Sequence, residues 1–151
     1  MKKFIYSMIA VLALGFTFVS CGDDNDDPSI DFSTTADQGS AGPYSGTWTR
    51  TGDDGTETFS GSISLAAAGT NITTVTFSCP EADLNATSTA NVWHSNYGYQ
   101  FFNQTVSDAN QLGAAFSGRI DEAGNLNASF TISQRVGRKN VEFKFEFIGK
   151  K

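Results

Sequence analysis

A cluster of aromatic side chains is the feature of this sequence best suited to binding chemistry. It comprises Trp93, Tyr97, Tyr99, Phe101 and Phe102. On an extended chain Tyr97, Tyr99 and Phe101 share one face and Phe102 lies on the other, so one face can be exposed. An exposed aromatic ring can stack on a sugar ring or border a ligand cavity, whereas a buried ring fills a core. Both interpretations stay open, because aromatic residues are also common in ordinary strands.

Groups suited to acid–base, nucleophilic or metal chemistry are sparse. His94 is the single histidine, and nothing in the sequence places it in a Ser-His-Asp arrangement. Asp53 and Asp54 precede a glycine and have the composition of a turn. One histidine and two cysteines, Cys21 and Cys79, are too few for a structural zinc site of the usual four-ligand kind. We therefore expect no enzyme, no metal centre and no cofactor.

The first 20 residues have the pattern of an export signal. Lys2 and Lys3 precede an apolar run over residues 4–19, which is shorter than the roughly 20 residues that a membrane-spanning helix needs. Phe18-Val19-Ser20-Cys21 resembles the lipobox of bacterial lipoproteins, with Phe18 where leucine is usual. We expect cleavage before Cys21 and lipidation of that cysteine, which would anchor the protein in a membrane.

An acidic segment follows this cysteine. Residues 22–27 contain four aspartates and are similar to the export signal behind the lipidated cysteine of Bacteroidetes surface lipoproteins. We expect residues 1–20 to be the signal peptide, residues 21–43 a flexible tether and residues 44–151 the folded domain. The acidic segment favours the outer membrane with display at the cell surface, and the periplasmic face is the alternative.

Negative charge is concentrated in the expected tether. The 151-residue chain has 10 basic and 16 acidic side chains, and without Lys2 and Lys3 its net charge is −8. Six of the acids lie between residues 23 and 37, so the rest of the chain is nearly balanced. Because an acidic chain without a basic stripe is repelled by phosphates, we expect no nucleic-acid partner. A hydrophobic content of 39% with 17% charged residues indicates a folded domain rather than a disordered chain.

Strands are the elements that must position the aromatic cluster. Residues 141–148 alternate strictly, with Phe143, Phe145 and Phe147 on one face and charged side chains on the other. The same alternation predicts eight strands, over residues 45–51, 56–65, 72–79, 90–95, 97–104, 112–120, 126–133 and 140–148. We expect the longest connection, with one helical turn, over residues 80–90. Eight sequential strands joined by short hairpins predict an all-β fold, an antiparallel up-and-down barrel, with a β-sandwich as the alternative.

The first predicted strand carries a family motif. Gly46-Thr47-Trp48 has the Gly-x-Trp pattern of lipocalins and the wider calycin group. The chain resembles lipocalin-like lipoproteins of Bacteroidetes, in its signal over residues 1–27 and in its architecture over residues 44–148. It differs from lipocalins in ending with Lys150 and Lys151, where they set an arginine against the tryptophan. The resemblance implies that Trp48 packs across the closed end of the barrel.

The resemblance also implies a cavity for a small hydrophobic or amphipathic ligand. We expect this cavity to be lined by Trp48, Trp93, Tyr97, Tyr99 and Phe101. A hollow interior larger than about 300 Å³ would favour this function. An interior filled by phenylalanines would count against it, since eight strands enclose little more than their own side chains. The residues that could fill it are Phe59, Phe116, Phe130, Phe143, Phe145 and Phe147.

Two other functions remain open at this point. One is a surface module for glycan or protein contact, which would use the aromatic cluster around Trp93. The other is a structural accessory lipoprotein, which no feature of the sequence distinguishes from the first.

Overall fold

The computed structural model describes residues 34–151. The expected signal peptide, Cys21 and the acidic segment lie outside the described residues. Within residues 34–151 no helix is both long enough and apolar enough to cross a membrane.

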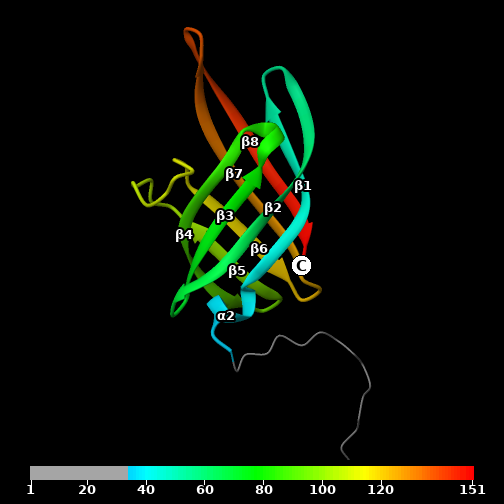
Figure 1. Ribbon diagram of the computed structural model, residues 1–151, viewed down its shortest axis with the longest axis vertical. Helices are drawn as coiled ribbons and strands as arrows, with labels where there is room; N and C mark the ends of the chain where they lie inside the picture. The colour runs from blue at the N-terminus through cyan, green and yellow to red at the C-terminus, as the bar shows by residue number, and fades with distance from the viewer. Residues whose placement is uncertain (1–33) are drawn as a thin grey trace, which may run out of the picture.

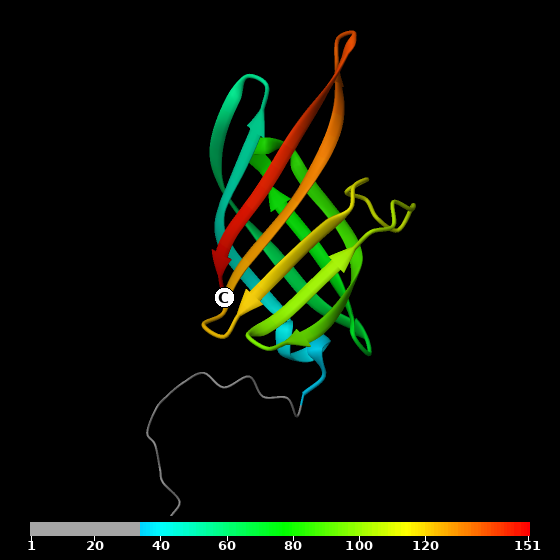
Figure 2. The same ribbon diagram turned by 180° about the vertical axis from the view of Figure 1, so that it is seen from behind.

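Eight antiparallel strands form one closed barrel (Figures 1 and 2). They are β1 (Gly42–Gly52), β2 (Gly55–Gly69), β3 (Ile72–Cys79), β4 (Leu84–Ser95), β5 (Gly98–Asn103), β6 (Phe116–Asp121), β7 (Asn125–Val136) and β8 (Lys139–Lys150). Each strand pairs with the next in the sequence, and β8 pairs with β1. This closure confirms the predicted up-and-down barrel and rules out the sandwich, because the first and last strands belong to the same continuous sheet.

Successive side chains along each strand point alternately to the inside and the outside of the barrel. Along β3, Val75, Phe77 and Cys79 are fully buried and the residues between them are partly exposed. On β8 Phe145 and Phe147 are buried, as predicted, and Phe143 is half-buried. The strands therefore place one set of side chains inside the barrel and present the other set to solvent.

Glycines allow the first and last strands to approach closely. Gly46 lies directly opposite Gly149 in the pairing of β1 with β8. A Cβ atom on Gly46 would lie 2.1 Å from the carbonyl oxygen of Ile148, so the backbones leave no room for a side chain. The glycine of the Gly-x-Trp motif thus has a steric role at the point where the barrel closes.

The segment expected as the longest connection is mostly strand. Only Pro80–Ala82 forms a single 3-10 turn, and β4 starts at Leu84 rather than at residue 90. After Leu84 the inward positions of this part of β4 carry small residues, with Ala86, Ser88 and Ala90 all buried. Such residues give little hydrophobic contrast, which is why alternation in the sequence does not reveal the strand.

The longest connection instead covers residues 104–115, between β5 and β6. The predicted strand over residues 112–120 is shorter, because β6 begins at Phe116. Buried Asn110 organises the loop: its Nδ2 donates to the carbonyl oxygens of Thr105 and Ala114, and its Oδ1 accepts from the Ser88 hydroxyl at 2.6 Å. The loop lies beside the part of β4 that β5 does not reach.

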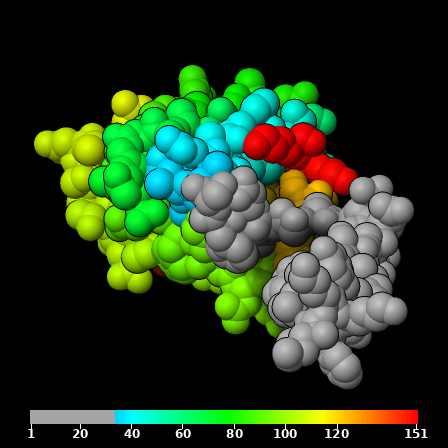
Figure 3. Space-filling view, turned by 90° about the horizontal axis from the view of Figure 1, so that it is seen from below, coloured from blue at the N-terminus to red at the C-terminus, as the bar shows by residue number. Residues whose placement is uncertain are grey.

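A short helix covers one end of the barrel. Residues 34–43, expected in the tether, belong to the folded domain, because α2 (Ala36–Ser40) buries Ala36, Asp37 and Ser40. The Tyr44 hydroxyl donates to the Ser40 carbonyl oxygen at 2.7 Å, and burial raises the pKa of Tyr44 to about 12. Figure 3 shows this segment in cyan across the end of the barrel, beside the C-terminus in red. The hairpins β1–β2 and β7–β8 extend beyond the opposite end (Figure 1).

Candidate functional site

Aromatic rings occupy the interior of the barrel. The centroid of the Trp48 ring lies 4.9 Å from that of Phe147 and 5.8 Å from that of Phe130. Phe77 packs edge-on against Phe116 at 5.0 Å, and Phe130 stacks on Phe145 at 5.1 Å. These rings lie where a small ligand would have to sit, so the packing counts against a ligand inside the barrel.

Trp48 is fully buried in this interior cluster. Its Nε1 donates to the carbonyl oxygen of Ser78 at 3.2 Å, which satisfies the polar atom of the ring. Tyr44 is buried at the end next to α2. Lys151 donates through Nζ to the Ala41 carbonyl oxygen, so it ties the C-terminus to this same end.

The five residues expected to line one cavity are divided between the two faces of the wall. Trp48 and Phe101 are buried, and the Tyr99 ring packs against His94 at 5.0 Å. Trp93 and Tyr97 lie on the outside and are 38% and 63% exposed. Tyr97 does not share a face with Tyr99, because it lies in the turn that joins β4 to β5 and the alternation stops there.

His94 has a structural environment. Its Nε2 lies 3.1 Å from the carbonyl oxygen of Thr34, which links β4 to the segment before α2. Within residues 34–151, no three His, Cys, Asp or Glu side chains come together as metal ligands.

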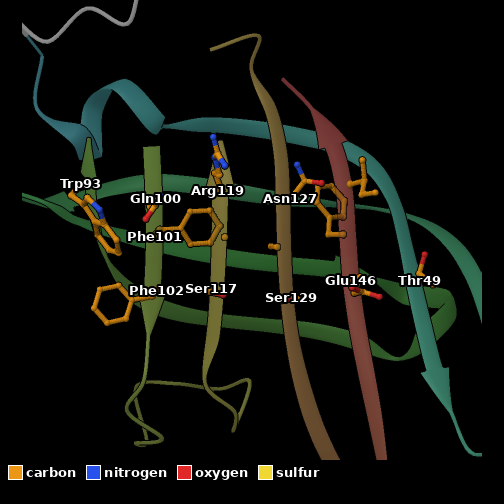
Figure 4. A pocket seen from close by; sticks show the side chains of 14 residues that line it. Thr49, Trp93, Gln100, Phe101, Phe102, Ser117, Arg119, Asn127, Ser129 and Glu146 are labelled. Carbon is orange, nitrogen blue, oxygen red and sulfur yellow. The ribbon is translucent and has the colours of Figure 1, made fainter. Parts of the chain in front are cut away.

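A hollow of about 500 Å³ lies on the outer wall of the barrel, and we call it the outer groove (Figure 4). It crosses six neighbouring strands, from β4 through β8 to β1. Its lining residues are Thr49, Trp93, Gln100, Phe101, Phe102, Ser117, Gly118, Arg119, Asn127, Ala128, Ser129, Glu146, Phe147 and Ile148.

Differences in side-chain size create the outer groove. Ser117 and Ser129 lie opposite each other on β6 and β7, and these short residues form a low floor. On one side the Trp93 and Phe102 rings meet edge to face at 5.0 Å and form a raised wall. Ile148 on β8, 66% exposed, borders the other side. A low polar floor beside a raised aromatic wall produces the concave shape.

A row of polar side chains crosses the floor. Gln100 pairs with Arg119 across β5 and β6, and Arg119 pairs with Asn127 across β6 and β7. The guanidinium carbon of Arg119 lies 5.8 Å from the centroid of the Tyr97 ring. Among the described residues, no carboxylate lies within ion-pair distance of Arg119, whereas Glu146 is paired with Lys144 at 2.8 Å. The groove thus offers amide and guanidinium donors beside exposed aromatic rings.

One carboxylate beyond the floor is held in its charged form. The side-chain amide of Asn125 donates to Asp121 at 2.8 Å and is the main cause of the lowered pKa of that carboxyl, to which Arg119 adds. The backbone N–H of Asn125 also donates to Asp121 at 2.8 Å. These contacts fix the β6–β7 turn below the groove.

Sequence reasoning found only part of this site. It singled out Trp93 and Phe102 as members of the aromatic cluster, but not the polar floor formed by Gln100, Ser117 and Arg119. No family model, no curated protein and no solved structure matches the chain. The geometry of the groove is therefore the basis for its interpretation.

Proposed function

We propose that this chain is a lipid-anchored, non-enzymatic surface protein that binds a carbohydrate in the outer groove. The observation that carries the proposal is the pairing of exposed aromatic rings with amide and guanidinium groups in one hollow. Apolar C–H faces of a sugar ring stack on aromatic rings, and its hydroxyl groups accept and donate hydrogen bonds at the edge. Trp93 and Phe102 supply the first kind of contact, and Gln100, Arg119 and Asn127 supply the second.

The composition of the groove favours a sugar over a purely apolar ligand. Half-exposed aromatic rings cover one wall and Ile148 borders the other, and the outward side chains between them are those of Gln100, Ser117, Arg119, Asn127, Ser129 and Glu146. An apolar molecule would leave those polar groups without partners, which costs free energy. The packed rings inside the barrel also count against a ligand there.

The anchoring part of the proposal rests on the sequence resemblance to lipocalin-like lipoproteins. Cys21 and the acidic segment lie outside the described residues. The chain enters the barrel through α2 at one end, whereas the outer groove lies on the side wall. A groove in this position would stay accessible if the α2 end faced a membrane.

Substitution of Trp93 tests carbohydrate binding. In a glycan-array screen of the barrel domain followed by titration, Trp93→Ala should weaken binding about fivefold or more, because a stacked ring contributes on the order of 1 kcal/mol. Phe102→Ala should weaken binding as well, since its ring supports Trp93 edge to face.

The matched control is Val136→Ala. Val136 is an exposed hydrophobic residue on the β7–β8 hairpin and does not line the groove. This variant should bind as the parent protein does. Glycan binding that survives both Trp93→Ala and Phe102→Ala would contradict the proposed site.

A further inference from the structure

The outer groove continues in both directions along the wall. A second hollow of about 370 Å³ shares Trp93, Gln100 and Arg119 with the outer groove and extends to Tyr97. A third hollow of about 270 Å³ shares Phe102, Ser117 and Ser129 with it. The third hollow reaches Gln104 and Ala115, the first and last residues of the long loop. Because neighbouring hollows share lining residues, the three adjoin one another along the wall, and we call them together the track.

The three hollows lie one after another alongside β5, and the central one also extends across the sheet to Thr49 on β1. Tyr97 precedes the strand and Gln104 follows it, so the track runs from the β4–β5 turn to the start of the long loop. Seven residue steps of about 3.3 Å give a length of about 23 Å. That length exceeds a single sugar ring several times over.

Both ends of the track are bordered by exposed residues. Tyr97 is 63% exposed, and Gln104 lies exposed at the first position after β5. A site for a terminal sugar unit would need a buried wall against which the end of the chain stops. Here a polymer could enter at one end of the track and leave at the other.

Each of the three hollows offers contacts for a sugar unit. The second hollow places Asn96 and Arg119 beside the Tyr97 ring. The central hollow has the aromatic wall described above. The third hollow offers the Gln104 amide beside the Phe102 ring and the Ser117 hydroxyl. The combination of an aromatic ring and a polar side chain therefore occurs three times along the track.

We propose that the track binds an internal stretch of a linear oligosaccharide, with consecutive sugar units in the three hollows. This inference rests on the proposed carbohydrate-binding function and specifies the ligand as a chain rather than a single sugar. Arg119 lines both the second and the central hollow, so it would contact the units on either side of their junction.

The test is a chain-length series. Fragments of one to six units from cellulose, xylan and polygalacturonate are titrated calorimetrically against the barrel domain. For a series that binds, affinity should rise about tenfold or more from the shortest fragment with measurable binding to the six-unit fragment, because longer fragments make additional contacts. Affinity should then level off once the track is filled.

Variants at the ends of the track separate the hollows. Tyr97→Ala and Gln104→Ala should each weaken binding of six-unit fragments several-fold and leave two-unit fragments nearly unaffected. Trp93→Ala should weaken binding at every length, since Trp93 lines the central hollow. All three residues are partly or fully exposed, so their truncation is expected to leave the fold intact.

The outcomes distinguish this inference from the proposed function. Equal affinity for the shortest and longest fragments would overturn the inference while the function stands. Glycan-array binding with no affinity for any of the three linear series would do the same. Absence of binding both on the array and in the series would overturn the inference and the proposed function together.

Discussion

Gly46 and Trp48 lie two positions apart on β1 and serve the barrel in different ways. Trp48 has the largest buried side chain of the described core. Gly46 is needed because it has no side chain, since a Cβ atom at this position would collide with the neighbouring backbone. The motif that joins them is readable in the sequence. Its steric reason is not, because the atom that would collide with a Gly46 side chain belongs to Ile148, about one hundred residues away in the chain.

Gly46→Ala is expected to destabilise the barrel. Inside a strand, replacing glycine by alanine normally stabilises the fold by roughly 0.5–1 kcal/mol. At Gly46, however, the added Cβ atom would lie 2.1 Å from a backbone oxygen. The collision should dominate and lower the free energy of unfolding by about 1–3 kcal/mol. Urea unfolding followed by tryptophan fluorescence measures the change.

Gly69→Ala is the matched control for this substitution. Gly69 ends β2, and the nearest atoms to an added Cβ are at ordinary contact distance, 3.8 Å or more. This variant should unfold at the same urea concentration as the parent or slightly above it. Equal stability of the two glycine variants would refute the steric role of Gly46.

At the scale of elements, α2 closes one end of the barrel through few contacts. The Asp37 carboxylate accepts a hydrogen bond from the backbone N–H of Asn71 at 2.9 Å, which holds the helix against the β2–β3 turn. This hydrogen bond is the main cause of the lowered pKa of Asp37, and the side chain of Thr35 adds to it. The helix is therefore attached by a charged group that can be titrated.

The difference in stability between wild type and Asp37→Asn, which lacks this charge, should depend on pH. Because the pKa of Asp37 is lower in the folded protein than in the unfolded chain, its contribution is present above about pH 4 and is lost as the pH falls through the folded value. Wild type should melt at a higher temperature than Asp37→Asn at pH 7, and the gap should narrow toward pH 2. Thermal unfolding monitored by circular dichroism across this range measures it.

Asp53→Asn provides the comparison, since Asp53 lies exposed in the β1–β2 turn. Its melting curve should follow that of wild type through the same pH range. A gap between wild type and Asp37→Asn that stays constant from pH 7 to pH 2 would contradict the role assigned to this carboxylate.

The elements differ in how well they can be predicted from the sequence. β8 is predictable because phenylalanines alternate with charged residues, and its three phenylalanines point inward as expected. The first half of β4 is not, because after Leu84 its inward residues are alanine and serine. The five residues of α2 are too few to show a helical period, so its packing on the barrel cannot be read from the chain.

The candidate site shows a similar division. An aromatic cluster is visible in the sequence, but its separation into inward Phe101 and outward Trp93 depends on where the β4–β5 turn falls. The floor of the groove depends on register, since Ser117 and Ser129 become neighbours only through the pairing of β6 with β7. Neither serine is distinctive by itself.

At the scale of the whole molecule, the proposed anchor and the proposed binding surface lie in different parts of the chain. The proposed lipid attachment precedes the described residues, and the folded chain starts at the α2 end of the barrel. Residues 22–33 would join the two as an acidic spacer. Loss of the anchor should therefore leave the fold and the groove unchanged.

Cys21→Ala tests the proposed lipid anchor. The variant should lose metabolic labelling by radioactive or alkyne-tagged fatty acid and remain unprocessed or appear in the soluble fraction. Cys79→Ala is the control, because Cys79 is buried on β3 and should have no part in lipidation. Unchanged labelling and membrane association of Cys21→Ala would refute the lipoprotein assignment.

Because inward and outward positions alternate along each strand, substitutions on the outside could change the ligand specificity of the proposed groove without disturbing the core. Cohesion of the barrel comes from rings such as Trp48 and Phe77, while the polar side chains of the proposed recognition surface stand at the alternate, outward positions. Exchange of residues such as Gln100, Ser117 or Asn127 would leave the packing of those rings in place. Many outward residues of this barrel can therefore be substituted, in a laboratory library or in evolution, with little loss of folding stability.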